Sequence, residues 1–101
     1  MEKVLEMPEA AEIELAGVLQ ALSDPVRLAI VEELAAGGEQ ACGAIPLPVS
    51  ASTRSHHFKI LREAGVTITR TAGTTRLVSL RRADLERRFP GLLDAVLGAG
   101  R

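Results

Sequence analysis

The feature of the sequence that most restricts its fold is a change of hydrophobic period near residue 65. Before that point, apolar residues recur at helical spacing. After it, the stretches VTITRT and TTRLVSL are rich in β-branched residues and flank Ala72-Gly73. Apolar residues three or four apart line one side of a helix, whereas β-branched runs around a glycine are typical of a hairpin. The chain is therefore expected to form helices followed by a two-stranded hairpin.

Local start and stop signals divide the helical part of the chain. Helices are expected over residues 11–22 and 25–36, separated by Ser23-Asp24-Pro25, a cap residue followed by proline at the first helical position. Prolines limit residues 41–47 to a turn or two. Ser50 can cap a longer helix that runs to Ala64 and stops at Gly65.

The expected order of elements describes a winged helix-turn-helix, mainly α with a two-stranded β-hairpin wing. A chain of 101 residues is enough for one domain with a modest core. Asp84 can cap a short helix and Pro90 can begin a last one, while residues 1–9 lack periodicity and are expected to be flexible. The single domain 1–101 then contains a helix-turn-helix over 42–64, a wing over 66–80 and a C-terminal helical segment over 83–98.

Composition excludes several classes of function. Two phenylalanines, with no tyrosine or tryptophan, exclude an aromatic platform for single-stranded nucleic acid. One cysteine excludes an internal disulfide framework and a multi-cysteine zinc module within one chain. No apolar run has the length of a membrane span, and the acidic N-terminus does not resemble a secretory signal. A cytoplasmic protein is therefore expected.

The net charge of −1 conceals an uneven distribution. Residues 1–40 carry nine acids against two bases, whereas residues 41–82 carry seven bases against one acid. A basic block that coincides with the expected helix-turn-helix and wing favours a surface that binds a polyanion. The alternative is an ordinary solvated surface with chance clustering.

Three segments resemble the ArsR family of bacterial repressors. They are LSDPVRLAIVEEL at 22–34, SASTRSHHFKILREAGV at 50–66, and the hairpin that follows. The resemblance runs from about Leu15 to Leu80. It implies a homodimeric winged-helix repressor that binds a double-stranded DNA operator near its own promoter. Many members of the family release DNA on binding a metal ion, and others respond to oxidation or other signals, or have no known effector.

The angular positions of residues 50–64 predict which side of the recognition helix faces DNA. Phe58, Leu61 and Ala51 share the inward side at 100° per residue, and the opposite side is polar. Hydroxyl and imidazole groups can bond base edges or phosphates, and basic side chains in the wing can reach the flanking backbone. The predicted DNA-binding residues are Ser50, Ser52, Thr53, Arg54, Ser55, His56, His57, Lys59, Arg70, Thr74 and Arg76.

Two positions in this helix leave alternatives open. Arg54 stands where the family usually has an apolar residue, and it either reaches outward to a phosphate or fills a local packing role. His56 and His57 point about 100° apart, so they cannot share one metal ion within a helix. His57 lies at the edge of the inward side, where a hydrogen-bonded boundary histidine is the alternative to a DNA contact.

The sequence contains no complete metal site of the kinds familiar in the family. Cys42 stands alone in residues 39–45, the short segment expected to brace the recognition helix and called the bracing segment below. The last helix has acids but no histidine. Cys42 is interpreted first as a small buried residue. The alternatives are a redox-sensing thiol or a metal ligand shared with other segments. The effector is therefore unknown, and a divalent metal such as nickel or zinc stays open.

The apolar residues of the terminal helices predict a homodimer. Ile13, Leu19, Leu92, Leu93 and Val96 exceed what one small core is expected to hide, so an interface through the first and last helices is expected. The function that follows is sequence-specific transcriptional regulation, most simply repression. The alternatives are an activator of the same fold or a winged helix that binds only protein. No set of residues indicates an enzyme.

Overall fold

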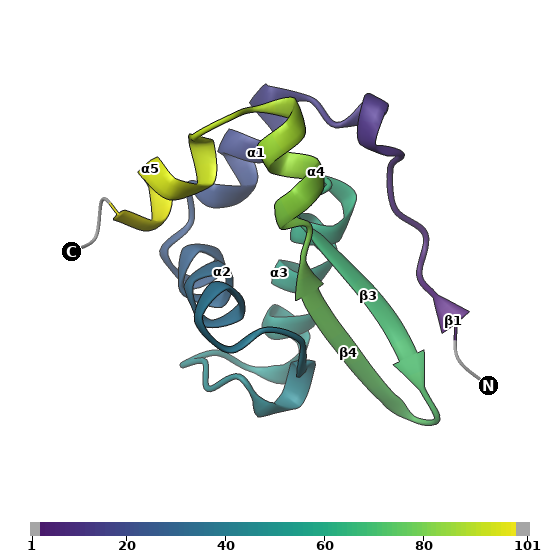
Figure 1. Ribbon diagram of the computed structural model, residues 1–101. Coiled ribbons are helices and arrows are strands. Elements are labelled where there is room, and N and C mark those ends of the chain that lie inside the picture. The colour runs from purple at the N-terminus through teal and green to yellow at the C-terminus, as the bar shows by residue number, and fades with distance from the viewer. Residues whose placement is uncertain (1–2, 99–101) are drawn as a thin grey trace.

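The computed structural model describes residues 3–98 and confirms helices followed by a hairpin (Figure 1). The elements in chain order are β1 (Lys3–Val4), η1 (Ala10–Glu12), α1 (Leu15–Leu22), α2 (Pro25–Gly37), β2 (Gln40–Ala41), η2 (Cys42–Ala44), α3 (Ala51–Glu63), β3 (Thr67–Ala72), β4 (Thr75–Leu80), α4 (Arg82–Arg88) and α5 (Leu92–Gly98). Within residues 3–98, no helix has both the length and the apolar character that a membrane crossing requires.

The local signals around α2 and α3 act as the sequence predicts. The Asp24 carboxylate accepts hydrogen bonds from the backbone N–H of Val26 at 2.8 Å and of Arg27 at 3.1 Å. These bonds, the one from Arg27 foremost, hold the pKa of Asp24 below its ordinary value. Ser50 caps α3 by accepting from the N–H of Thr53 at 3.3 Å. Helix α3 therefore begins and ends where its capping residues place it.

The first predicted helix is shorter than expected. Residues 10–12 form a separate 3₁₀ turn, and Ile13 has the extended dihedrals φ −70° and ψ 123° before α1 begins at Leu15. Ile13 is only 1% exposed because its side chain turns inward toward Gly65. Burial of this side chain therefore interrupts the helix that the periodicity predicted. Asp84 is likewise not a cap: it lies in the first turn of α4, and Arg81 is the N-cap residue.

A four-stranded antiparallel sheet, ordered β1-β3-β4-β2, extends the predicted hairpin on both edges. Lys3 and Val4 pair with Thr71 and Arg70, and the N–H of Leu5 donates to the carbonyl of Thr69 at 2.8 Å. Residues 3–5, part of the segment expected to be flexible, thus pair with β3, while residues 1 and 2 lie outside the described part. Strands β1 and β2 pair through backbone groups and are two residues long, which is too short for a side-chain pattern to predict them.

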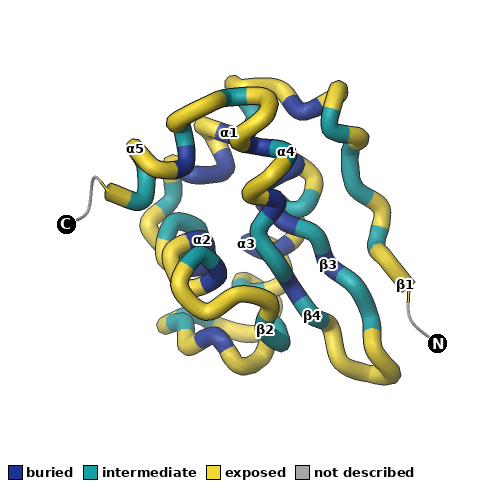
Figure 2. Tube along the Cα trace, viewed as in Figure 1, coloured by how far each residue is buried: buried dark blue, intermediate teal, exposed yellow. Residues whose placement is uncertain are grey.

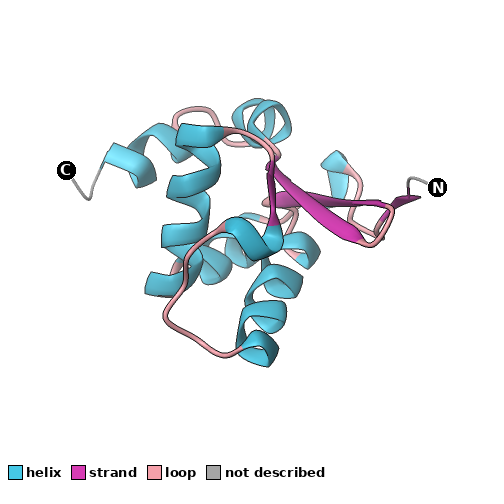
Figure 3. Cartoon of the chain, turned by 90° about the horizontal axis from the view of Figure 1, so that it is seen from below, coloured by secondary structure: helices cyan, strands magenta, loops and turns pink. Residues whose placement is uncertain are grey.

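The core lies where α1, α2, α3 and α4 meet the inner face of the hairpin (Figure 2). Val18, Ile30, Leu61, Val78 and Leu85, one from each of these elements, are fully buried. Figure 3 shows the hairpin extending away from the helices, so that its tip is free of the core. The fold therefore presents α3 and the hairpin tip from one packed domain.

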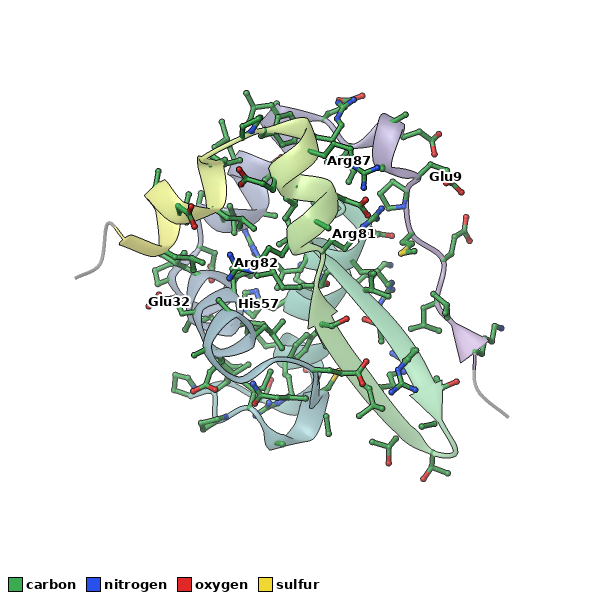
Figure 4. The ribbon with its side chains drawn as sticks, viewed as in Figure 1. Glu9, Glu32, His57, Arg81, Arg82 and Arg87 are labelled. Atoms are coloured by element: carbon green, nitrogen blue, oxygen red, sulfur yellow. The ribbon has the colours of Figure 1, made fainter. Side chains whose placement is uncertain are left out.

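Two arginines of the C-terminal part, Arg81 and Arg88, fasten the N-terminal segment to the domain, and Figure 4 labels Arg81 at the start of α4. Arg81 is buried and donates to the Pro8 carbonyl at 2.7 Å and to the Asp84 carboxylate at 3.1 and 3.0 Å. Arg88 donates to the carbonyl of Ile13 at 2.5 Å. A buried guanidinium is tolerated only when its donors are satisfied, and the donors of Arg81 meet a carboxylate and a carbonyl here.

Candidate nucleic-acid interface

The outward side of α3 is exposed where the angular analysis placed it. Its polar side chains project from a helix whose opposite side is held in the core by the buried Phe58 and Leu61. Ala51, predicted to face inward, is exposed because it occupies the first turn, beyond the edge of the core. The predicted DNA-contacting residues that are exposed on α3 are Ser52, Thr53, Ser55, His56 and Lys59.

His57 lies on the buried side of α3, away from this surface. It is 8% exposed, and its Nδ1 is 3.3 Å from Nη1 of Arg27 in α2. An arginine can only donate, so Nδ1 of His57 is the acceptor in this contact. Of the two alternatives for His57, the structure shows the hydrogen-bonded boundary histidine. Arg27 also donates to the Ala21 carbonyl at 2.7 Å, so it connects α1, α2 and α3.

Arg54 has the local role rather than an outward one. Its Nη1 donates to the carbonyl of Cys42 at 3.0 Å and to the carbonyl of Ile45 at 2.6 Å. Both carbonyls belong to the bracing segment that packs against α3, and the 3₁₀ turn there is too short to satisfy them itself. Arg54 therefore fixes the bracing segment to the recognition helix, in place of the apolar contact usual in the resembled family.

The two wing arginines project from opposite faces of the hairpin. Arg70 pairs with Leu77 and Arg76 pairs with Thr71, and cross-strand partners share a face, so Arg70 and Arg76 do not. Arg76 is exposed on the face toward α3. Arg70 donates to the Glu39 carboxylate at 2.9 and 2.6 Å, and this lowers the pKa of Glu39. Thr74 is exposed at the hairpin tip, after Gly73 with φ 64°.

Internal contacts use part of the basic block of residues 41–82. The side chains of Arg54, Arg70 and Arg81 donate the internal hydrogen bonds given above. Nη1 of Arg82 lies 4.0 Å from Oδ1 of Asp94. Within residues 3–98, the side chains of Lys59, Arg62 and Arg76 make no hydrogen bond or ion pair. These three cations on α3 and the wing are the ones available to a polyanion. Arg62 was not among the predicted DNA-binding residues, although its charge within the basic block of residues 41–82 was a signal for it.

The predicted dimer interface is only partly exposed. Ile13 and Leu93 are each 1% exposed, so they belong to the core of the protomer, and the inferred apolar surplus is wrong for these two. Leu19 is 47% exposed, Leu15 beside it on α1 is 46% exposed, and Leu92 and Val96 on α5 are half-buried. The remaining apolar surface on the terminal helices is therefore centred on α1.

Cys42 is a half-buried free thiol in the bracing turn. Burial raises the pKa of this thiol, while the nearby guanidiniums of Arg76, Arg54 and Arg62 lower it. Among residues 3–98, no three histidine, cysteine or acidic side chains gather in a way that could hold a metal ion.

Comparisons with known proteins agree with this geometry. A helix-turn-helix domain family matches residues 22–70. The HTH-type transcriptional regulator YceK of Bacillus subtilis is 42% identical over 84 residues, which cover 80% of this chain and 84% of that protein. The HTH-type transcriptional regulator Rv2034 of Mycobacterium tuberculosis is 46% identical over 63 residues, covering 60% and 58%.

Two solved structures share the fold. An ArsR family transcriptional regulator superposes with a TM-score of 0.69 at 21% identity, covering 86% of this chain and 97% of its own. The transcriptional repressor BigR from Xylella fastidiosa superposes with a TM-score of 0.61 at 30% identity, covering 74% and 85%. With the exposed polar side of α3, the adjoining wing and these relatives in view, the chain belongs to the HTH-type transcriptional regulators, and its fold is the winged helix-turn-helix of the ArsR family regulator.

Proposed function

We propose that this protein is a sequence-specific repressor that binds double-stranded DNA as a homodimer. The observation that carries the proposal is the exposed polar side of α3 next to three cations, Lys59, Arg62 and Arg76, whose side chains make no hydrogen bond or ion pair within residues 3–98. In a winged helix-turn-helix, the recognition helix enters the major groove. Ser52 and His56 then face base edges, while Lys59 and Arg76 face the phosphate backbone.

Repression is supported by the resemblance to the transcriptional repressor BigR. A dimer that covers an operator near a promoter excludes the polymerase. The direct test is genomic footprinting to find the bound site, followed by transcription from that promoter in vitro with purified polymerase. Repression predicts that the transcript falls as the protein is added. A rise of the transcript from the same site would show an activator and contradict this part of the proposal.

The backbone contacts are tested by the dependence of affinity on salt. Binding to duplex DNA is expected to weaken with salt, with a log–log slope of roughly −0.9 per phosphate neutralised. Arg76→Gln should weaken binding to operator and random duplex alike and make this slope shallower. Arg87→Gln is the matched control, since Arg87 is exposed on α4 and pairs with Asp84. Unchanged affinity and slope for Arg76→Gln would show that this face of the wing does not contact DNA.

Base recognition is tested by substitutions on the outward side of α3. Ser52→Ala and His56→Ala should each reduce the preference for the operator over scrambled DNA by about 1–3 kcal/mol, with a smaller change in non-specific affinity. Both side chains are exposed, so neither change should disturb the core. If the double variant discriminates as well as the parent protein, α3 does not read the sequence through this side.

A further inference from the structure

A small cavity lies where the bracing turn, α3 and the hairpin meet. Its volume is about 60 Å³. This is more than the share of liquid volume of one water molecule, roughly 30 Å³. Ser55 and Arg76 are exposed, so the cavity opens to solvent beside them. The polar side chains that line it are Cys42, Arg54, Ser55, Arg62, Thr69 and Arg76.

One buried hydroxyl in this lining lacks a partner. Thr69 is 2% exposed, and its Oγ1 makes no hydrogen bond within the described residues. The residue opposite Thr69 across the hairpin is Val78, whose side chain has no group that could form a hydrogen bond with Oγ1. A buried hydroxyl left unpaired is unfavourable, and a hydroxyl can both donate and accept, so the place of Thr69 in the cavity wall favours a polar occupant.

The charges around the cavity determine what kind of occupant fits. Three guanidiniums, those of Arg54, Arg62 and Arg76, are close enough to act on the Cys42 thiol. The cavity lining contains no carboxylate. Glu6, Glu12 and Glu63 line the wider groove next to it, and none of them forms an ion pair with Arg62 or Arg76. Every polar side chain in the lining can donate a hydrogen bond, and the arginines cannot accept one.

We propose that this cavity binds a phosphate-class oxyanion. Guanidiniums and hydroxyls are the donors that tetrahedral oxyanions prefer. Because Nη1 of Arg54 is held by the carbonyls of Cys42 and Ile45, the donors that this lining offers such an ion are the guanidiniums of Arg62 and Arg76 and the hydroxyls beside them. Two sources have this chemistry: a phosphodiester of bound DNA, or free inorganic phosphate. If the occupant is a phosphodiester of DNA, the inference rests on the proposed DNA binding. If the occupant is free inorganic phosphate, the inference does not depend on DNA binding. In either case the occupant touches the bracing turn, the recognition helix and the wing together.

The single cysteine supplies a direct readout of occupancy. An oxyanion seated against Cys42 should shield the thiol from iodoacetamide, and the rate of alkylation can be followed by mass spectrometry at one mildly alkaline pH. The reaction is run on the full chain with inorganic phosphate, with random-sequence duplex DNA, and with sodium chloride at matched ionic strength. Binding of the same duplex is measured separately by fluorescence anisotropy.

Variants of the lining test whether the protection comes from this site. Thr69→Val keeps the shape of the side chain and should weaken protection about three- to tenfold in ligand concentration. Arg62→Gln should weaken it about tenfold or more, because a charged donor is lost. Arg82→Gln, an exposed arginine on α4 outside the cavity lining, is the matched control and should behave like the parent protein.

Each outcome decides the proposal. Saturable protection by phosphate that is lost in Thr69→Val assigns the site to a free oxyanion, and protection by duplex alone with the same loss assigns it to the DNA backbone. Equal protection by chloride, protection retained in both lining variants, or no protection at all overturns the proposal. Duplex binding without protection removes only this inference. Phosphate protection without duplex binding removes the DNA-binding function and leaves the cavity site.

Discussion

At the scale of single residues, Gly65 shows how one position joins two parts of the fold. It ends α3 with φ 86°, and a Cβ built there would lie 2.6 Å from Cγ1 of Ile13. The left-handed conformation lets the chain turn from α3 into β3, and the missing side chain lets Ile13 enter the core. The glycine therefore serves both the recognition helix and the N-terminal segment.

Gly65→Ala should lower the free energy of unfolding by about 1–3 kcal/mol, because alanine strains the backbone and overlaps Ile13. Gly17→Ala is the matched control: Gly17 lies in α1 with open space at its Cβ position. That change should raise the free energy of unfolding by about 0.5–1 kcal/mol. Urea denaturation of both variants measures the difference, and equal stabilities would contradict the role given to Gly65.

Thr67 offers a second test at this scale. It is fully buried, and its Oγ1 makes no hydrogen bond within residues 3–98. Thr67→Val keeps the branched shape and removes the unpaired hydroxyl, so it should raise the free energy of unfolding by about 1 kcal/mol. Thermal and urea denaturation measure this change. A loss of stability would mean that the hydroxyl is satisfied in solution, for instance by a water molecule.

At the scale of elements, arginines position the pieces of the helix-turn-helix. The bracing segment contains only a 3₁₀ turn, and Arg54 holds its carbonyls against α3. A second side-chain contact, between Nη1 of Arg27 and Nδ1 of His57, connects α2 to α3. The presentation of the recognition helix therefore depends on side-chain bonds to neighbouring elements as well as on apolar packing.

Arg54→Met should separate this positioning role from a phosphate contact. The loss of two charge-assisted hydrogen bonds should lower the free energy of unfolding by about 1.5–3 kcal/mol and weaken binding to DNA. Because Arg54 bonds to carbonyls, the salt slope of DNA binding should stay unchanged. A shallower slope without loss of stability would show instead that Arg54 neutralises a phosphate.

The Glu39–Arg70 pair predicts a pH dependence in the hairpin. Hydrogen bonds from Arg70 lower the folded-state pKa of Glu39 from its ordinary value of 4.5. The pair therefore contributes stability above pH 4.5, and this contribution is lost as the pH falls through the folded-state value. Since the side chains are 30% and 36% exposed, the contribution is only about 0–1 kcal/mol. Glu39→Gln should have a lower free energy of unfolding than the parent protein near neutral pH. At low pH, urea denaturation should give the same free energy of unfolding for both.

At the scale of the whole molecule, the exposed apolar surface of α1 is the surface on which a second copy is expected to pack in the proposed dimer. Leu15 and Leu19 are one helical turn apart and each nearly half exposed, and the half-buried Leu92 and Val96 of α5 extend the terminal apolar surface. A stripe of this kind favours an interface that joins terminal helices.

Leu15→Asp combined with Leu19→Asp should convert the dimer to a folded monomer with weak operator binding, as measured by sedimentation and anisotropy. Val4→Asp is the matched control, since Val4 is 50% exposed but lies on β1, away from α1. It should leave the dimer intact. Leu93→Asp is unsuitable, because Leu93 is buried in the protomer and its change should unfold the chain. A monomeric parent protein at micromolar concentration would refute the dimer.

Local signals in the chain were sufficient to predict the types of most elements and many of their limits. Periodicity, the caps at Asp24 and Ser50 and the stop at Gly65 act over a few residues, so they can be read without a structure. The exposed side of α3 followed from the same periodicity. The first helix is the exception to these local predictions. It is shorter than its periodicity predicted, because Ile13 is buried against Gly65, which is distant in the sequence.

The roles of the charged residues depended on contacts between distant parts of the chain. Arg70 meets Glu39, Arg54 meets the bracing carbonyls, and Arg81 meets Pro8. Each pairing joins residues that no local pattern connects, so a count of bases could not separate bonded arginines from available ones. The same holds for β1, which pairs through its backbone, and for the cavity at Thr69, which exists only where three elements meet. Local preferences of neighbouring residues determine helices, caps and turns. Which distant residues become partners is determined by the packing of the whole domain.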